Sequence, residues 1–290
     1  MPFKIAIASG KGGTGKTTVA VNLYWNLVQT RDKATLLVDC DVEEPNDILF
    51  FPGAGIKFRE DITQPVPEID PDLCTYCRKC VRYCQFNAIT VIPPVKFAQV
   101  APDLCHSCGA CLYACEDNAI VEKPVVIGTL THYSAGDGKG LTEGRLKVGL
   151  ALQTPVIRRV KNIHDDSAAY VIYDSPPGTS CPVVAVISDA DYVILVTEPT
   201  PFGLHDLKIA VDVVRQVDKP FGVVINKAGL GNEEVYDFLE EENIPVLTQI
   251  PFRKDYARQY SESLILSEDN KEYRVYYQEI MDKIFDSSRI

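Results

Sequence analysis

Residues 3–18 read FKIAIASGKGGTGKTT, and this stretch decides the fold. Its first part, residues 3–9, is a short apolar run of the kind that forms a buried parallel strand. A glycine-rich turn follows, and residues 16–29 have helical spacing. Residues 10–17 also fit the phosphate-loop pattern G-x-x-x-x-G-K-[ST], which requires a strand before it and a helix after it. The stretch therefore predicts a nucleoside triphosphate site rather than a glycine turn without a ligand.

The residue types of this loop suit phosphates. Glycines let backbone N–H groups turn inward, and the N-terminus of the helix adds a partial positive charge. We expect Lys16 against the β- and γ-phosphates and the Thr17 hydroxyl on Mg²⁺. The expected cofactors are therefore ATP or ADP with Mg²⁺. The binding residues would be Gly10, Lys11, Gly12, Gly13, Thr14, Gly15, Lys16, Thr17 and Thr18.

The rest of the chain alternates between apolar and amphipathic segments. Further strands are predicted at residues 35–39, 147–151, 170–174, 192–197, 221–226 and 245–250. Helices are predicted at residues 154–161, 181–188, 204–217, 233–241 and 271–285. This alternation predicts an α/β fold with a doubly wound, mostly parallel sheet. Ligands of such a sheet bind beyond the carboxyl ends of its strands.

One segment, residues 64–124, breaks this alternation. It holds eight of the ten cysteines, and prolines mark its edges and its middle. The words PDLC and NAI each occur twice in it, with the copies 31 residues apart, which indicates a duplicated unit. We therefore predict a split main domain, residues 1–63 and 125–290. Residues 64–124 would form a domain inserted after the second strand.

The eight cysteines of this segment are regularly spaced, as Cys74-x2-Cys77-x2-Cys80-x3-Cys84 and Cys105-x2-Cys108-x2-Cys111-x3-Cys115. This run resembles that of bacterial ferredoxins with two [4Fe–4S] clusters, in which the fourth cysteine ligates the other cluster. The resemblance implies a small α+β ferredoxin-like domain. Its cluster ligands would be Cys74, Cys77, Cys80 and Cys115 in one set and Cys84, Cys105, Cys108 and Cys111 in the other. Zinc is the alternative, but zinc sites usually show two separated cysteine pairs. The chain departs from the ferredoxin run at one position of each copy. In ferredoxins a proline follows the fourth cysteine, whereas here Gln85 follows Cys84 and Glu116 follows Cys115.

Lys11 adds a second lysine early in the phosphate loop. The loop resembles that of the MinD/Mrp-type ATPases with a deviant Walker A motif, and the whole chain resembles members of that superfamily with an inserted ferredoxin domain. The resemblance implies that Lys11 reaches across a nucleotide-sandwich homodimer to the phosphates of the partner. A cation supplied in this way stabilises charge on the transferring phosphoryl group. The alternative is a solvated loop lysine.

The resemblance also assigns the polar residues that follow two of the strands. In the first switch, Asp41 would orient the attacking water and Asp39 would lie near magnesium. In the second switch, Asp174 would hold a magnesium-bound water, and Gly178 would offer its N–H to the γ-phosphate. The candidate catalytic residues are thus Lys11, Lys16 and Asp41.

Weaker assignments follow from the same resemblance. Asn226 would read the adenine base, and Pro251 with Phe252 would flank its pocket, although a buried asparagine that caps a turn has the same pattern. Two cysteines lie outside the cysteine-rich segment, Cys40 between the first-switch acids and Cys181 after the second switch. In a dimer Cys181 would approach its symmetry mate. A labile bridging cluster is therefore the alternative to a small buried thiol.

The bulk composition limits the partners. The chain of 290 residues has a net charge of −11, which repels nucleic acid and anionic membranes as a whole. The sequence has no signal-peptide pattern and no apolar run long enough to span a membrane. Ten cysteines in such a chain favour metal ligation in a reducing compartment, so a cytoplasmic location is expected. The amphipathic residues 271–290 have an even balance of charges, which favours packing in the core over a membrane anchor.

Together these patterns predict an ATP-hydrolysing iron–sulfur protein. ATP would drive formation of a homodimer, and the nucleotide state would be coupled to electron transfer or to cluster handling. A redox or iron–sulfur protein would be its partner. The alternative is a positioning or scaffold ATPase whose clusters are structural or sensory. A third hypothesis is a cluster-assembly carrier that uses Cys181.

Overall fold

The computed structural model of the protein describes residues 1–31, 34–134, 139–163 and 168–287. The chain folds into two compact units. The first unit comprises Met1–Arg59, Leu130–Arg145 and Ile157–Ile290, and the second comprises Glu60–Thr129 and Leu146–Val156. The larger unit is thus interrupted twice along the chain.

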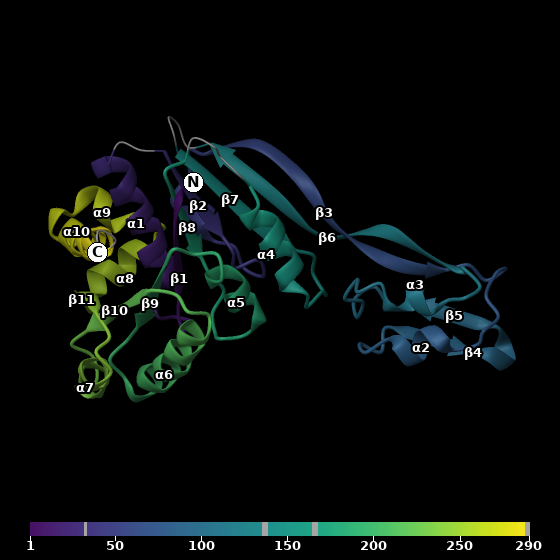
Figure 1. The fold of residues 1–290 in the computed structure, drawn as a ribbon. Coiled ribbons are helices and arrows are strands. Elements are labelled where there is room, and N and C mark those ends of the chain that lie inside the picture. The colour runs from purple at the N-terminus through teal and green to yellow at the C-terminus, as the bar shows by residue number, and fades with distance from the viewer. Residues whose placement is uncertain (32–33, 135–138, 164–167, 288–290) are drawn as a thin grey trace. The chain divides into compact units, whose positions relative to one another are not determined.

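The main sheet has, over the described residues, nine strands in the order β11-β10-β9-β1-β8-β2-β7-β6-β3 (Figure 1). Its central strands are buried, as in the TLLVD run of β2, whose five residues are all buried. Neighbouring strands from β11 to β7 pair in parallel. The predicted α/β class with a mostly parallel sheet is therefore confirmed. The strands are β1 (Phe3–Ala8), β2 (Thr35–Asp39), β3 (Gly55–Ile69), β6 (Ile120–Ser134), β7 (Lys139–Leu146), β8 (Tyr170–Asp174), β9 (Tyr192–Thr197), β10 (Phe221–Ala228) and β11 (Val246–Pro251).

Helices cover both faces of the sheet in the first unit (Figure 1). On one face α1 packs against β1, β2 and β8 and against α9 and α10. On the other face α5 contacts β1 and α6 contacts β9.

The start of α6 shows how the sequence determines where a helix begins. The hydroxyl of Thr200 accepts a hydrogen bond from the backbone N–H of Gly203, with 3.0 Å between Oγ1 and N. Pro201 occupies the first helical position. The helices are α1 (Lys16–Arg31), α4 (Gln153–Lys161), α5 (Cys181–Ile187), α6 (Pro201–Gln216), α7 (Glu234–Glu241), α8 (Lys254–Ser261), α9 (Leu266–Asp269) and α10 (Lys271–Ser287).

The last helix, α10, is part of the hydrophobic core. Tyr273, Tyr277, Ile280 and Ile284 are at most 1% exposed and pack with α1 and the central strands. The predicted core packing of the C-terminal segment is therefore confirmed over its described part. None of the helices in the described ranges is long and apolar enough to cross a membrane.

The prediction of a strand at residues 147–151 is wrong. The chain leaves β7 just before it and turns, and the N–H of Leu150 donates to the carbonyl of Lys147 at 3.1 Å. Gly149 has a φ of +90°, which ends the extended course, and Val148 is fully exposed. The apolar character of this run therefore does not reflect burial. The long strands β3 and β6, and β7 itself, were not predicted.

Besides its parts of β3, β6 and α4, the second unit contains, over its described residues, a small antiparallel sheet and two short helices. The sheet is a hairpin of β4 (Ile89–Ile92) and β5 (Phe97–Val100) around the 3₁₀ turn η2 (Pro93–Val95). The helices α2 (Lys79–Tyr83) and α3 (Ala110–Ala114) pack against each other. Left-handed backbone conformations recur at the offset of the sequence repeat, in the pairs Tyr76 and Ser107, Arg78 and Gly109, and Asn87 and Asn118. The two copies therefore follow the same local course.

Candidate functional site

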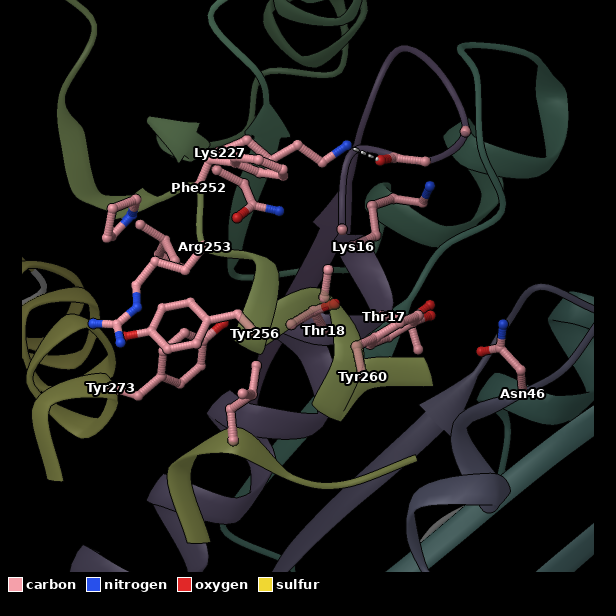
Figure 2. A pocket seen from close by; sticks show the side chains of 18 of the residues that line it. Lys16, Thr17, Thr18, Asn46, Lys227, Phe252, Arg253, Tyr256, Tyr260 and Tyr273 are labelled. Atoms are coloured by element: carbon pink, nitrogen blue, oxygen red, sulfur yellow. Dashed lines mark hydrogen bonds between the residues drawn. The ribbon is translucent and has the colours of Figure 1, made fainter. Parts of the chain in front are cut away.

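A cavity of about 330 Å³ opens in the first unit, where the glycine-rich loop meets the ends of the parallel strands (Figure 2). It brings together segments from the start, the middle and the end of the chain. Ten residues predicted for catalysis or nucleotide binding line it, namely Gly12, Gly13, Gly15, Lys16, Thr17, Thr18, Asp41, Asn226, Pro251 and Phe252. Three more, Gly10, Lys11 and Thr14, line a small hollow between the loop and α6.

The glycines of the loop are needed for close approach. Gly15 has a φ of +97°, and a Cβ atom there would lie 2.2 Å from the side-chain nitrogen of Asn226. That Nδ2 group donates a hydrogen bond to the carbonyl of Thr14 at 2.7 Å. A Cβ atom at Gly10 would lie 2.2 Å from the carbonyl oxygen of Asp206 on α6. A larger residue at either position would displace the loop, and Asn226 holds the loop in addition to lining the cavity.

Lys16 and Thr17 begin α1 and face the cavity (Figure 2). Burial lowers the pKa of Lys16, against the charges of Asp174 and Asp41, which act in the opposite direction. The hydroxyl of Thr17 donates to Oδ2 of Asp174 at 2.7 Å. A cation and a hydroxyl therefore stand at a helix N-terminus, which is a favourable place for an anion.

Two predicted acids lie side by side at the carboxyl ends of β2 and β8. The strand register pairs Asp39 with Asp174, and each is 1% exposed. Asp39 accepts hydrogen bonds from the backbone N–H groups of Asp41, Asn46 and Asp47. Burial raises the pKa of Asp39 well above its ordinary value and that of Asp174 to about 6. Ionised carboxylates are therefore unfavourable here unless a cation compensates them.

The oxygen atoms at this edge fit Mg²⁺. Within the part of the chain that the structure describes, no N–H group donates to Oδ1 of Asp174 or to either carboxylate oxygen of Asp47, and the two carboxyl groups face each other. Mg²⁺ prefers oxygen ligands and is usually held by one or two carboxylates together with waters and phosphates. Thr17 and Asp174 would supply the protein side of such a site. Among the described residues, no group of three or more His, Cys, Asp or Glu side chains is arranged to hold an ion by itself.

Sequence reasoning missed Asp47, which opens the 3₁₀ turn η1 (Asp47–Phe50) and is fully buried. Burial raises its pKa well above the ordinary value, and the charges of Asp39 and Asp174 add to this effect. Nothing in the local spacing marks this residue. Sequence reasoning also missed Glu198, which follows β9 at the same edge of the sheet. The rule that selected the other acids at strand ends could have found it.

Glu198 binds two lysines at once. Its Oε1 lies 2.5 Å from Nζ of Lys11, and its Oε2 lies 2.9 Å from Nζ of Lys227. Lys227 also donates to the carbonyl of Gly13 at 2.8 Å. Burial acts to raise the pKa of Glu198, but the hydrogen bonds from both lysines outweigh it and hold the pKa below the usual value. Lys11 is thus paired within its own chain.

One side of the cavity is an aromatic wall made of Phe252, Tyr256, Tyr260 and Tyr273 (Figure 2). The rings of Tyr256 and Tyr273 meet edge to face with centroids 4.8 Å apart, and the guanidinium of Arg253 lies 4.8 Å from the Tyr256 ring. Such a surface suits a flat base, as the loop suits phosphates. The sequence indicated only Pro251 and Phe252 at this wall, because α8 was not predicted.

Asp39 and Asp174 do not line this cavity, and neither do three other residues near the predicted switches, Gly178, Cys40 and Cys181. The N–H of Gly178 donates to the carbonyl of Ser9 at 3.1 Å, so a phosphate could reach it only after that bond breaks. Cys40 is fully buried, and burial raises the pKa of its thiol well above the ordinary value. Cys181 is exposed at the first residue of α5.

The second unit contains two small cavities, each lined by four cysteines. The ferredoxin resemblance implied the same two sets, including the exchange of the fourth cysteine. Backbone N–H groups of Tyr76, Ala88 and Ser107 lie 3.4 Å from the sulfur atoms of one cysteine each, and such contacts favour thiolates. All ten cysteines, which lie within the described ranges, are free thiols. The sets are Cys74, Cys77, Cys80 and Cys115 in one cavity and Cys84, Cys105, Cys108 and Cys111 in the other.

The sequence of this chain is similar to a known protein family and to several individual proteins. Residues 5–266 match the CobQ/CobB/MinD/ParA nucleotide binding domain. An uncharacterized protein of Methanocaldococcus jannaschii is 30% identical over 283 residues, which cover 97% of this chain and 96% of that protein. An iron–sulfur cluster carrier protein of Pyrococcus abyssi is 25% identical over 228 residues, which cover 77% of this chain and 60% of that protein.

A solved structure shows the same fold. The septum site-determining protein MinD of Pyrococcus horikoshii, complexed with Mg-ADP, superposes with a TM-score of 0.58 at 17% sequence identity. The likeness covers 98% of this chain and 96% of that one. The family match spans most of the chain, from the first strand to the start of α9. The chain therefore belongs to the CobQ/CobB/MinD/ParA family of nucleotide-binding proteins.

Proposed function

We propose that this protein is an ATP-hydrolysing iron–sulfur protein, a nucleotide switch that dimerises on binding ATP. Its nucleotide state would be coupled to electron transfer or to cluster handling through two [4Fe–4S] clusters, with a redox or iron–sulfur protein as partner. The observation that carries the proposal is the presence, in one chain, of a P-loop cavity and two four-cysteine cavities.

The large cavity supports the nucleotide half of the proposal. The phosphates would lie at the loop and the N-terminus of α1, where Lys16 supplies a positive charge. The base would lie against the aromatic wall, between Asn226 and Pro251. These placements use both ends of the cavity and leave the middle for the ribose.

Hydrolysis needs a metal, a positioned water and charge stabilisation. Mg²⁺, when bound, withdraws charge from the phosphate oxygens. Thr17 and Asp174, already in hydrogen-bond contact, would hold the ion or its waters, with Asp39 beside them. Asp41 lines the cavity and would orient the attacking water. Burial raises the pKa of Asp41, and a carboxylate with a raised pKa accepts a proton more readily.

The dimer half of the proposal concerns Lys11. Its ammonium would leave Glu198 and contact the phosphates bound by the partner subunit, where it would stabilise the transferring phosphoryl group. In the single chain the same ammonium is neutralised by Glu198. The exchange of one anionic partner for another would link ATP binding to dimer formation.

The two sets of four cysteines support the part of the proposal that concerns iron–sulfur clusters. Four thiols around one small cavity suit an iron–sulfur cluster, and exchange of the fourth cysteine is a feature of two-cluster ferredoxins rather than of paired zinc ligands. The relative in Pyrococcus abyssi named as an iron–sulfur cluster carrier adds support for this chemistry. We accordingly propose residues 64–124 as a ferredoxin-like domain within an ATPase domain of residues 1–63 and 125–290. The second compact unit includes Glu60–Thr129, which contains this range, together with Leu146–Val156, which the proposed boundaries assign to the ATPase domain.

Anaerobic purification with iron, sulfide and zinc analysis tests the cluster half. We expect about eight iron and eight sulfide per chain, as two [4Fe–4S] clusters require. Zinc without sulfide would contradict it. A Cys181→Ser variant should keep the same iron content, because Cys181 lies outside both cysteine sets. Iron beyond eight that disappears in this variant would instead favour a cluster carrier.

The Lys16→Ala variant tests whether the two halves are separable modules. It should lose ATP and ADP binding and keep its iron, because Lys16 lies in the first unit. Redox titration with ATP and with ADP then tests coupling. Potentials that differ between the two nucleotides support a redox switch, whereas equal potentials favour the alternative of a positioning or scaffold ATPase with structural clusters.

A further inference from the structure

The duplicated unit allows a residue-by-residue comparison of its two cysteine cavities. We call the cavity of Cys74, Cys77, Cys80 and Cys115 the first cluster site and that of Cys84, Cys105, Cys108 and Cys111 the second cluster site. The ligands, the helix starts and three pairs of left-handed residues correspond at the repeat offset of 31 residues. Of the other lining side chains, Ala119 and Ile120 of the first site recur as Ala88 and Ile89 of the second, but four positions differ in chemistry.

The first cluster site has a polar and charged wall. The Thr75 hydroxyl donates to a carboxylate oxygen of Asp117 at 2.7 Å, and both residues line the cavity. Arg78 and Lys79 line it as well, and Lys79 forms an ion pair with Glu116. Two of the lining side chains are therefore cationic and one is anionic.

The second cluster site has an aromatic and small-residue wall at the corresponding positions. His106 stands in place of Thr75 and Phe86 in place of Asp117, and their rings stack with centroids 3.7 Å apart and an interplanar angle of 12°. Gly109 and Ala110 stand in place of the arginine and the lysine. Apart from the imidazole, no titratable side chain other than the cysteines lines this cavity in the described unit.

These walls act differently on an added electron. Reduction adds negative charge to a cluster that four thiolates already make anionic. Cationic and hydrated neighbours stabilise that charge, while apolar and aromatic neighbours exclude the solvent and the dipoles that would stabilise it. Asp117 opposes the effect at the first site, and so does Glu116 through its ion pair with Lys79, so that two acids balance the two cations in number. The difference between the sites therefore rests on the polar, exposed wall of the first against the stacked rings and small residues of the second.

We propose that the two clusters have different reduction potentials and that the first cluster site is reduced first. This inference rests on the proposed function, since it presumes that both sites hold clusters. One electron from a low-potential donor reduces the first site, and a second electron reduces the second site at a lower potential. An electron that enters through the second site therefore moves downhill to the first. The duplicated module gives electron flow a direction.

The test is a redox titration of the full chain, followed by electron paramagnetic resonance, with dithionite as donor. It is made at one fixed pH for all variants. The wild type should show two separate one-electron steps. A variant with both Arg78→Gly and Lys79→Ala gives the first site the residues of the second, and its upper step should move down toward the lower one.

The reciprocal variant is Gly109→Arg. A Cβ atom at Gly109 would have no neighbour within 4 Å, and Arg78 already adopts the same left-handed conformation in the sister copy. This variant should raise the lower step and leave the upper step in place. Lys96→Ala is the matched control, because Lys96 carries an equal charge but lines neither cavity. It should move neither step appreciably.

Iron and sulfide analysis of the same samples shows whether the proposed function fails or only the proposed order of reduction potentials. A chain without two clusters overturns the proposed function and this inference with it. A chain with two clusters that titrate in one combined step overturns this inference alone. The assignment is also overturned if the Arg78→Gly and Lys79→Ala changes lower the lower step and leave the upper step unchanged.

Discussion

Nζ of Lys11 lies 2.5 Å from Oε1 of Glu198, and the side chains are 28% and 14% exposed. Lys11 belongs to the phosphate loop, which follows β1. Glu198 follows β9, the strand that pairs with β1. Glu198 holds Lys227 with its other oxygen, and Lys227 in turn binds the loop carbonyl of Gly13. The lysine proposed to act across a dimer is thus restrained in the single chain by a shared carboxylate.

A Glu198→Gln change should therefore favour the ATP-bound dimer. The neutral amide weakens the restraint, and a partly exposed charge-assisted contact of this kind contributes about 1 kcal/mol. The dissociation constant of the homodimer should fall roughly fivefold for each subunit, or about 25-fold for the two together, since 1.4 kcal/mol corresponds to tenfold. Sedimentation with ATP and Mg²⁺ measures it.

The matched control for this change is Lys227→Met. It removes the other ion pair of Glu198 and leaves the pair with Lys11 intact, so the dimer should gain no stability. Nucleotide affinity is measured in both variants, because Lys227 lines the cavity. Equal or weaker dimerisation of Glu198→Gln at saturating ATP would show that the contact does not restrain Lys11.

The buried carboxylate of Asp47 gives a prediction about stability. Among the described residues, no N–H group donates to its oxygens; its carboxyl group faces that of Asp174, and Asp39 adds like charge. An Asp47→Asn change removes the charge and introduces an N–H donor for the unpartnered oxygen of Asp174. We expect the free energy of unfolding to rise by about 1–3 kcal/mol, the usual cost of an unsatisfied buried group. The melting temperature should rise roughly 2–4 °C per kcal/mol.

This measurement is made in EDTA without nucleotide and repeated with Mg²⁺ and ADP. A bound cation compensates the acidic edge, so the difference between wild type and variant should shrink in the second condition. Glu143→Gln is a suitable comparison, because Glu143 is also buried but Tyr133 donates to one of its oxygens at 3.1 Å. A less stable Asp47→Asn protein in EDTA would mean that the charge is compensated in the free chain.

The phosphate loop and the two runs of four cysteines could be predicted because each is a local pattern, whereas the exchange of the fourth cysteines was implied by the ferredoxin resemblance. The loop needs eight consecutive residues between a strand and a helix, and the cysteine sets need fixed spacings repeated once. The apolar runs of β2, β8 and β9 likewise indicate burial on both faces of a sheet. In these elements the residues that define the structure are neighbours in sequence.

The missed features depend on neighbours that are distant in sequence. Pro65 and Pro67 suggested punctuation at the edge of the insert, yet they lie inside β3. This strand is at the edge of the sheet, where a missing N–H breaks no ladder bond. The partners of Glu198 come from the loop and from β10, and Asp47 meets Asp174 from the far half of the chain. No spacing rule within one segment reports such contacts.

The position of the base can be tested with Phe252, which lines the aromatic wall and is 42% exposed. Stacking of a base on an aromatic side chain is worth about 1–3 kcal/mol, so Phe252→Ala should weaken ADP binding roughly tenfold. Binding of inorganic tripolyphosphate, which has no base, should not change. Phe202→Ala is the control, because Phe202 is 78% exposed and lines no part of the cavity. Equal losses for ADP and tripolyphosphate would place the base elsewhere.

The exchange of fourth cysteines gives the sharpest test of the second unit. Cys74 and Cys115 line the same cavity although 41 positions separate them, whereas Cys74 and Cys84 line different ones. A chain with Cys74→Ser and Cys115→Ser should therefore lose one cluster and retain about four iron atoms. A chain with Cys74→Ser and Cys84→Ser damages both sites and should retain almost none. Iron analysis after anaerobic purification distinguishes them.

The two double variants remove the same number of thiols, so a general loss of stability would lower the iron content of both. Melting temperatures measured alongside identify that outcome. The opposite ranking, with more iron left in the Cys74→Ser and Cys84→Ser chain, would mean that each run of four cysteines holds its own metal. The crossed sets that line the cavities would then not be the ligand sets, and the case for a two-cluster ferredoxin unit would be lost.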